Sequence, residues 1–193
     1  MRVIVGITGA TGAIYGVRLL ERMREAGVDT HLVISRWGAR TLLHETSWSR
    51  ERVEALASAV YAPADMGAAI SSGSFRTDGM VIAPCSAKTL AAIAHGFGEN
   101  LIHRAADVVL KERRRLVLAI REAPLSDIHL ENMLKLSRMG AVILPPMPAF
   151  YNNPRTIDDV IDYTVARILD QFGIQVESAM RWSGDMGVGR GSD

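Results

Sequence analysis

The sequence predicts a three-layer α/β sandwich, in which helices cover both faces of a mainly parallel six-stranded sheet. Short apolar runs alternate along the chain with segments whose apolar residues recur at helical spacing. The apolar runs are almost continuously hydrophobic, which is typical of strands buried on both faces of a parallel sheet. This alternation favours right-handed crossover connections within one sheet.

Six apolar runs have the length and composition of strands. In chain order the predicted strands are Arg2–Ile7, Asp29–Ile34, Ala59–Ala62, Gly79–Ala83, Arg115–Ile120 and Ala141–Leu144. Pro84 predicts the end of the fourth strand, because proline has no backbone N–H to donate to the sheet.

Helices are predicted between and after these strands. They are Ala13–Ala26, Trp37–His44, Ser49–Ala57, Lys88–His95, Asn100–Glu112, Asp127–Ser137 and Ile157–Phe172. The last helix has the clearest pattern, with Thr156 as its N-cap, Asp159 three residues later and one continuous apolar stripe. The helical periodicity stops after Gly173. We therefore expect one Rossmann or flavodoxin-like domain over residues 1–182 and a flexible, glycine-rich tail over residues 183–193.

The composition fits a globular protein and excludes several function classes. The chain has 193 residues, 48% hydrophobic and 22% charged, with a net charge of +1. A chain of this length buries roughly 70% of the surface that its unfolded form would expose. Because it has no basic tail and few aromatic residues, nucleic acid is not an expected partner. The apolar stretches are strand-sized, so we expect no membrane span.

Cysteine and histidine usage bears on location and metals. Cys85 is the only cysteine, which excludes an internal disulfide and a multi-cysteine zinc site. The five histidines show no metal-ligand spacing, so we expect no structural metal. Met1 and Arg2 lead directly into the first strand without a signal peptide, and a cytoplasmic location is expected.

A glycine turn directly follows the first strand. Thr8-Gly9-Ala10-Thr11-Gly12 lies between the apolar run Val3–Ile7 and an amphipathic helix. Glycines let the backbone approach a ligand closely, and the helix that follows presents free N–H groups and the positive end of its dipole. The pattern predicts a phosphate-binding turn and leaves open which phosphate compound it binds.

The next strand ends carry polar or reactive residues. Ser35 follows the second strand where a dinucleotide site would usually have an acid, which disfavours NAD. Ser86 opens a helix after the fourth strand, either as a second anion- or ring-binding site or as a simple N-cap. Cys85 is expected to be a buried small hydrophobic residue. Arg121 and Glu122, held by Pro124, would place a fixed charge pair at the ligand-binding edge, or else form an exposed ion pair.

The C-terminal half adds two further candidates. Four prolines between residues 145 and 154 make a stiff segment that can hold Tyr151 in place. Arg167 lies at the edge of the apolar stripe of the last helix, where it either binds an anion or covers the core with its aliphatic part. Residues 111–115, Lys-Glu-Arg-Arg-Arg, are expected to form a solvated helix end, of which only Lys111 is kept as a candidate.

Taken together, the motifs resemble the UbiX flavin prenyltransferase family, and the SGSFRTDG stretch is most similar to the branch associated with phenolic-acid decarboxylases. The similarity extends over roughly residues 2–182. The motifs that carry it are Thr8–Ala13, Ser71–Met80, Pro84-Cys85-Ser86, Arg104–Val108, Arg121–Ser126 and Ile128–Met133.

This resemblance implies a metal-independent transferase. The family joins the dimethylallyl group of dimethylallyl phosphate to N5 and C6 of reduced FMN and closes a fourth ring. Prenylated FMN is the cofactor of UbiD-type aromatic acid decarboxylases, and older annotation called the family itself decarboxylases. The resemblance also implies homotrimers that associate into a dodecamer, with active sites between subunits.

The resemblance further assigns roles by position. FMN would be held by Gly9, Ala10, Thr11, Ser35, Ser86, Ala87, Lys88, Thr89 and Arg121. Dimethylallyl phosphate would be bound by Tyr151, Arg167, Lys111 and Arg104. Glu122 would assist departure of the phosphate and later remove the proton from flavin C6. Glu45 would be a second carboxylate near the phosphate. Thr11 would lie close to the flavin and the donor, and Trp182 would face the allyl group.

Two positions depart from the family pattern, because Thr11 replaces a common serine and Ile120 a frequent proline. Neither change removes a reacting group. A short-chain NAD(P) reductase is excluded, since no Tyr-x-x-x-Lys pair occurs. A cysteine decarboxylase of similar fold would need a Met-Asn-x-x-Met type segment, whereas Met147 is followed by Pro148. A subunit that only stores or delivers flavin is the non-enzymatic alternative.

Overall fold

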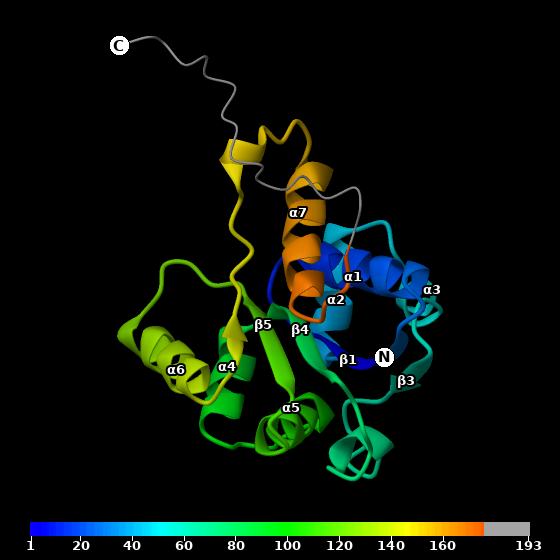
Figure 1. Ribbon diagram of the computed structural model, residues 1–193, viewed down its shortest axis with the longest axis vertical. Coiled ribbons are helices and arrows are strands. Elements are labelled where there is room, and N and C mark those ends of the chain that lie inside the picture. The colour runs from blue at the N-terminus through cyan, green and yellow to red at the C-terminus, as the bar shows by residue number, and fades with distance from the viewer. Residues whose placement is uncertain (176–193) are drawn as a thin grey trace.

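Six parallel strands form one sheet in the computed structural model, which describes residues 1–175. They are β1 (Arg2–Ile7), β2 (Asp29–Ile34), β3 (Ala59–Tyr61), β4 (Gly79–Cys85), β5 (Arg115–Ile120) and β6 (Val142–Ile143). The order is β3-β2-β1-β4-β5-β6, with every neighbouring pair parallel (Figure 1). The chain reverses its direction of progress across the sheet between β1 and β4, as in doubly wound nucleotide-binding folds. The predicted fold class is confirmed.

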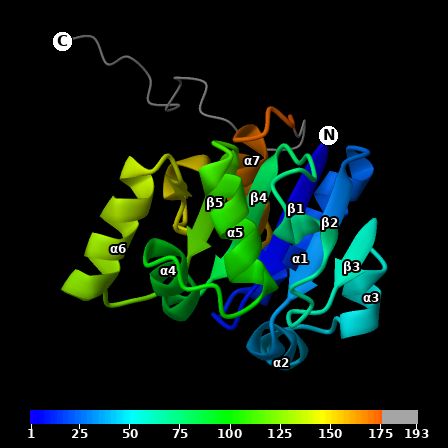
Figure 2. The same ribbon diagram turned by 90° about the horizontal axis from the view of Figure 1, so that it is seen from below.

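Helices cover both faces of this sheet. They are α1 (Ala13–Glu25), α2 (Arg36–Glu45), α3 (Arg50–Glu54), α4 (Ala87–Ala94), α5 (Leu101–Lys111), α6 (Asp127–Arg138) and α7 (Ile157–Asp170), with 3-10 turns η1 (Ala69–Ser71) and η2 (Phe150–Asn152). The side chains of α1, α2, α3 and α7 pack into one core cluster, and those of α4, α5 and α6 into the other. In Figure 2, α5 lies in front of β4 and β5, and α7 lies behind them.

The strands supply side chains to both clusters in alternation. In β1, Val3, Val5 and Ile7 face the cluster of α1 and α7, whereas Ile4 faces that of α4 and α5. This period of two is the geometry of a pleated strand. Because both faces are covered, almost every residue of the central strands is buried, which explains their uninterrupted apolar sequence.

The fourth strand does not end at Pro84 as predicted but continues to Cys85. The carbonyl of Pro84 accepts hydrogen bonds from the backbone N–H of Thr8 at 3.2 Å and from its hydroxyl at 2.7 Å. The pairing register with β5 shifts between Ile82 and Cys85, so the strand accommodates the missing N–H. Cys85 is fully buried as expected, and burial raises the pKa of its thiol to about 12.

The other differences from the predicted elements are differences of length. Ser49 caps α3 rather than belonging to it, and this helix ends at Glu54, before the predicted Ala57. The edge strands β3 and β6 are one to two residues shorter than predicted, and η1 and η2 were not predicted. The cap of α7 is confirmed, since Thr156 and Asp159 each accept a backbone N–H of the other.

Candidate functional site

A cavity of about 570 Å³ opens at the carboxyl ends of β1, β2 and β4. This is the edge at which doubly wound sheets bind ligands. Five of the residues predicted to hold FMN line it, namely Gly9, Ser35, Ser86, Lys88 and Thr89. Two others border it in sequence, since Ala10 follows Gly9 and Ala87 begins α4.

Three helices begin at this cavity. The Ser35 hydroxyl accepts the N–H of Gly38 at the start of α2, and the Ser86 hydroxyl accepts that of Thr89 at the start of α4. Asn100 caps α5 in the same way, so the positive ends of three helix dipoles meet at one hollow. This arrangement favours an anionic ligand such as a phosphate. The exposed Lys88 ammonium pairs with Glu99 at 2.9 Å on the rim.

An exposed tryptophan adds an aromatic wall. Trp37 lines the cavity with 64% of its surface exposed, and the guanidinium of Arg40 lies 4.9 Å from its ring centre. Its backbone lies so close to Gly9 that a Cβ there would come within 2.4 Å of the Trp37 Cβ. Gly9 is therefore required by packing. Trp37 was not among the predicted site residues, although it lies only three residues after the end of β2.

A histidine of α5 lies at the same cavity. His103 is buried, and desolvation lowers the pKa of its imidazole; the nearby Glu99 carboxylate opposes this shift and Lys88 adds to it. The ring is therefore neutral at neutral pH and can act as donor or acceptor. His103 was not among the predicted site residues, because the spacing of the histidines bears on metal binding alone.

The helix start that follows the glycine turn contacts a carboxylate. One carboxylate oxygen of Glu45 accepts the N–H groups of Gly12 at 2.8 Å and Ala13 at 3.1 Å. Gly12 is the N-cap of α1, has a φ of 94° and carries no side chain to cap the helix itself. These two N–H groups have a carboxylate partner in the structure, and phosphate binding by the turn stays a prediction. The starts of α2, α4 and α5, by contrast, lie at the cavity.

A second hollow, of about 540 Å³, lies on the other side of the glycine turn. Thr11, Glu45 and Arg121 line it together with Ile157 of α7. Glu122 follows Arg121 at the end of β5, and its carboxylate accepts the N–H of Ala123 at 3.2 Å. Within residues 1–175 no ion pair joins Arg121 to Glu122, so the alternative of an exposed ion pair between them is not observed, and Arg121 lines the hollow instead. Successive residues of an extended chain point to opposite sides, which separates the two groups.

Tyr151 and Arg167 come from neighbouring elements at the opposite end of the chain. Tyr151 lies in η2, and its hydroxyl is 2.6 Å from that of Tyr163 in α7. Arg167 lies one turn after Tyr163, is exposed and pairs with Asp170 at 2.7 Å.

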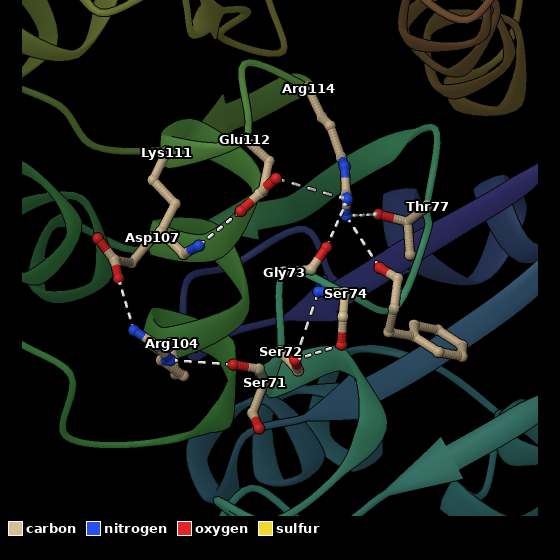
Figure 3. A network of polar contacts seen from close by, with 11 residues as sticks. Ser71, Ser72, Gly73, Ser74, Thr77, Arg104, Asp107, Lys111, Glu112 and Arg114 are labelled. Atoms are coloured by element: carbon tan, nitrogen blue, oxygen red, sulfur yellow. Dashed lines mark hydrogen bonds and ion pairs between the residues drawn. The ribbon is translucent and has the colours of Figure 1, made fainter.

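Arg104 and Lys111 both belong to α5 (Figure 3). Arg104 donates to the carbonyl of Ser71 at 3.1 Å and pairs with Asp107 at 2.9 Å. Lys111 pairs with Glu112 at 2.6 Å. Both cations thus lie beside the serine-rich segment that follows η1, in the α4–α6 layer.

The predicted solvated helix end is wrong for Arg114. Its guanidinium donates to the carbonyls of Gly73 at 2.7 Å and Phe75 at 2.9 Å, and only 17% of the side chain is exposed. Figure 3 shows this side chain pointing into the 72–77 segment. Arg113 and Arg115 are exposed, as predicted.

One chain therefore brings together only part of the predicted site. The cavity and the second hollow lie on either side of the glycine turn, whereas Lys111 and Arg167 lie in layers on opposite faces of the sheet. Trp182 and the expected tail lie outside the described residues. Over residues 1–175, no helix is long and apolar enough to cross a membrane, and no three His, Cys, Asp or Glu side chains are grouped to hold a metal.

Comparison with known proteins shows the family to which this chain belongs. Residues 1–169 match the family described as Flavoprotein. The chain is 64% identical over 185 residues to a probable UbiX-like flavin prenyltransferase of Streptomyces sp. (strain D7), which covers 95% of this chain and 92% of that protein. This chain belongs to the UbiX family of flavin prenyltransferases. The resemblance seen in the motifs is thereby confirmed, and the chain is a flavoprotein of the transferase class.

Solved UbiX-like structures agree with this assignment. A dodecameric FMN-dependent UbiX-like decarboxylase from Escherichia coli O157:H7 is 59% identical with a TM-score of 0.94, covering 95% of this chain and all of that chain. A UbiX protein in complex with FMN and dimethylallyl pyrophosphate is 54% identical with the same TM-score, covering 95% and 97%. An FMN-dependent cysteine decarboxylase, SpaF, is 18% identical with a TM-score of 0.62 over 75% of this chain and 83% of its own, and shares the fold alone.

Proposed function

We propose that this UbiX-type protein transfers the dimethylallyl group of dimethylallyl phosphate to reduced FMN. The new bonds form at N5 and C6 with release of phosphate, and the prenylated FMN serves a UbiD-type aromatic acid decarboxylase. The observation that carries the proposal is the pair of hollows on either side of the glycine turn. One combines three helix starts with an aromatic wall, and the other combines Glu45 with Arg121.

The first cavity fits a flavin mononucleotide in size and in chemistry. Its volume of about 570 Å³ lies within the range typical of small-molecule sites. The starts of α2 and α4 suit the phosphate, Trp37 suits a flat ring, and the buried His103 offers a polar group to the ligand. We assign FMN binding to Gly9, Ala10, Ser35, Ser86, Ala87, Lys88 and Thr89 at this cavity, and to Thr11 and Arg121, which line the neighbouring second hollow.

Cleavage of the allyl–phosphate bond requires cations and hydrogen-bond donors on the departing phosphate. Tyr151, Arg167, Arg104 and Lys111 supply these groups in our proposal. Since α5 and α7 lie on opposite faces of the sheet, they can meet around one donor only if neighbouring subunits contribute. A homotrimer-based assembly, such as the dodecamer of the E. coli relative, satisfies this requirement.

Ring closure requires removal of a proton from the flavin. We assign this step to Glu122, which stands at the end of β5 next to Arg121, because a positioned carboxylate can act as general acid and then as general base. Glu45 holds the glycine turn on which Thr11 lies, so the second carboxylate also keeps that residue in place. Trp182 would stabilise developing allyl cation character by about 0.5–2 kcal/mol if it faces the allyl group.

Turnover under anaerobic conditions tests the proposal. Reduced FMN and dimethylallyl phosphate, incubated with the protein, should yield flavin heavier by one dimethylallyl group in a mass spectrum. Recovery of unmodified FMN alone, with both the monophosphate and the diphosphate donor, would contradict prenyl transfer. Binding of FMN without turnover would indicate a flavin carrier, and failure to take up FMN would exclude both functions.

A further inference from the structure

Tyr163 links the two residues of η2 and α7 that the proposed function assigns to the donor phosphate. Its hydroxyl oxygen lies 2.6 Å from that of Tyr151, a normal distance between two hydrogen-bonded hydroxyls. The two rings also pack edge to face, with centroids 6.3 Å apart and an interplanar angle of 88°. Both contacts fix the Tyr151 side chain, which is itself 53% exposed.

Arg167 lies on the same face of α7 as Tyr163. Tyr163, Arg167 and Asp170 are spaced at i, i+4 and i+7, so they lie in one row along α7. Asp170 holds the Arg167 guanidinium at 2.7 Å. The Tyr151 hydroxyl, bonded to Tyr163, is therefore located one helical turn from the Arg167 side chain.

The two hydroxyls can form a directed chain of hydrogen bonds to a bound anion. A tyrosine hydroxyl donates one hydrogen and accepts others, so Tyr163 can donate to Tyr151 while Tyr151 donates to a phosphate oxygen. Hydrogen bonds in such a chain polarise and strengthen each other. The bond to Tyr151 and partial burial both raise the pKa of Tyr163, so its hydroxyl keeps the hydrogen that this chain requires.

We infer that Tyr163 is a positioning residue for donor binding, which holds the Tyr151 hydroxyl beside Arg167 and donates to it when Tyr151 binds the phosphate. This inference rests on the proposed function, in which Tyr151 and Arg167 contact dimethylallyl phosphate. It adds a residue that the motifs did not select, since Tyr163 looks in sequence like any partly buried residue of an amphipathic helix.

The variant Tyr163→Phe removes the hydroxyl and keeps the ring packing. We expect the KM for dimethylallyl phosphate to rise about 3–10-fold, the effect of one lost neutral hydrogen bond. The kcat at saturating donor and the affinity for FMN should stay unchanged, because the cavity that we assign to FMN lies at the starts of α2 and α4. Unchanged FMN affinity also shows that the variant is folded.

A double-mutant cycle separates positioning from packing. Tyr151→Phe should raise the same KM, and the variant with both substitutions should be no worse than Tyr151→Phe alone. Tyr61→Phe is the matched control, because it removes a hydroxyl bonded to His31 at 2.8 Å at the β3 edge and should leave the KM unchanged.

Two results would overturn the inference while leaving prenyl transfer intact. One is a wild-type KM in Tyr163→Phe together with a raised KM in Tyr151→Phe. The other is a double variant in which the two effects multiply. A wild-type KM in Tyr151→Phe would overturn both its assigned contact and the role of Tyr163. The proposed function is tested separately, by whether the wild-type protein forms prenylated flavin.

Discussion

Two carboxylates near the second hollow have different surroundings and therefore different uses. Glu45 accepts two backbone N–H groups at the start of α1, which commits one of its oxygens to holding the glycine turn. Glu122 lies at the end of β5 and accepts the neighbouring N–H of Ala123 at the longer distance of 3.2 Å. Of the two, Glu122 is the one suited to carry a proton to and from a ligand.

The variant Glu122→Gln tests this assignment. The amide keeps the size of the side chain but is not a base, so FMN should still bind while the reaction stalls before ring closure. Formation of the four-ring product should fall by about 10²–10⁴-fold, the usual contribution of a general acid–base residue. The exposed Glu131 of α6 gives the control Glu131→Gln, which should keep full activity. Full activity in Glu122→Gln would contradict the assigned role.

At the scale of elements, two arginines hold the serine-rich segment that runs from η1 toward β4. Arg114 donates to two carbonyls of residues 73 and 75, and Arg104 donates to that of Ser71 (Figure 3). These bonds satisfy the backbone of a segment that has no regular structure. The segment is thereby fixed beside Lys111, one of the cations assigned to the donor.

The variants Arg114→Lys and Arg113→Lys form a matched pair of adjacent residues. Lysine keeps the charge but not the planar fork, so Arg114→Lys should lose at least one carbonyl contact. We expect the free energy of unfolding to fall by about 1–3 kcal/mol in denaturant titrations. Arg113 is exposed, and its variant should differ from wild type by less than about 0.5 kcal/mol. Equal stability of the two variants would show that the Arg114 contacts contribute nothing.

The helices and strands could be predicted because their signals are local. Apolar periodicity and caps such as Thr156 lie within a few residues of the element that they define. The predictions failed where a contact with a residue distant in the sequence determines the local structure. Pro84 stays in a strand because Thr8 bonds to its carbonyl, and Arg114 is partly buried because residues 73 and 75 lie beside it. Neither partner can be inferred from the neighbouring sequence.

At the scale of the whole molecule, the predicted site is divided among separate surfaces. The position of FMN-binding candidates at one sheet edge could be predicted, because parallel strands all end there. The positions of Tyr163 and His103 could not be predicted, since tertiary contacts alone bring them to these surfaces, whereas Trp37 lies close enough to the end of β2 to be selected from the sequence. The motif-based assignment of Lys111 and Arg167 to one phosphate requires more than one chain.

Mixed assemblies of inactive variants test this sharing. We expect Lys111→Ala and Arg167→Ala each to lose activity, and their co-expressed mixture to recover up to about a quarter of wild-type activity. With random mixing, about a quarter of the shared sites would combine an intact Lys111 from one type of subunit with an intact Arg167 from the other. A mixture of Tyr151→Ala and Arg167→Ala is the control, because both residues lie on the same side of one chain and no recovery is expected. Absence of recovery in the first mixture would contradict shared sites.

The strand order also constrains how the chain folds during synthesis. β1 is a central strand, yet one of its two partners, β4, begins at Gly79, more than seventy residues later in the sequence. A ribosome therefore produces β1, β2 and β3 well before the free edge of β1 can be paired. Until then a strand that is apolar from Val3 to Ile7 has unpaired backbone groups available to other chains. Pairing of β4 with β1 removes this edge, so the emergence of residues 79–85 ends the period in which β1 is exposed to aggregation.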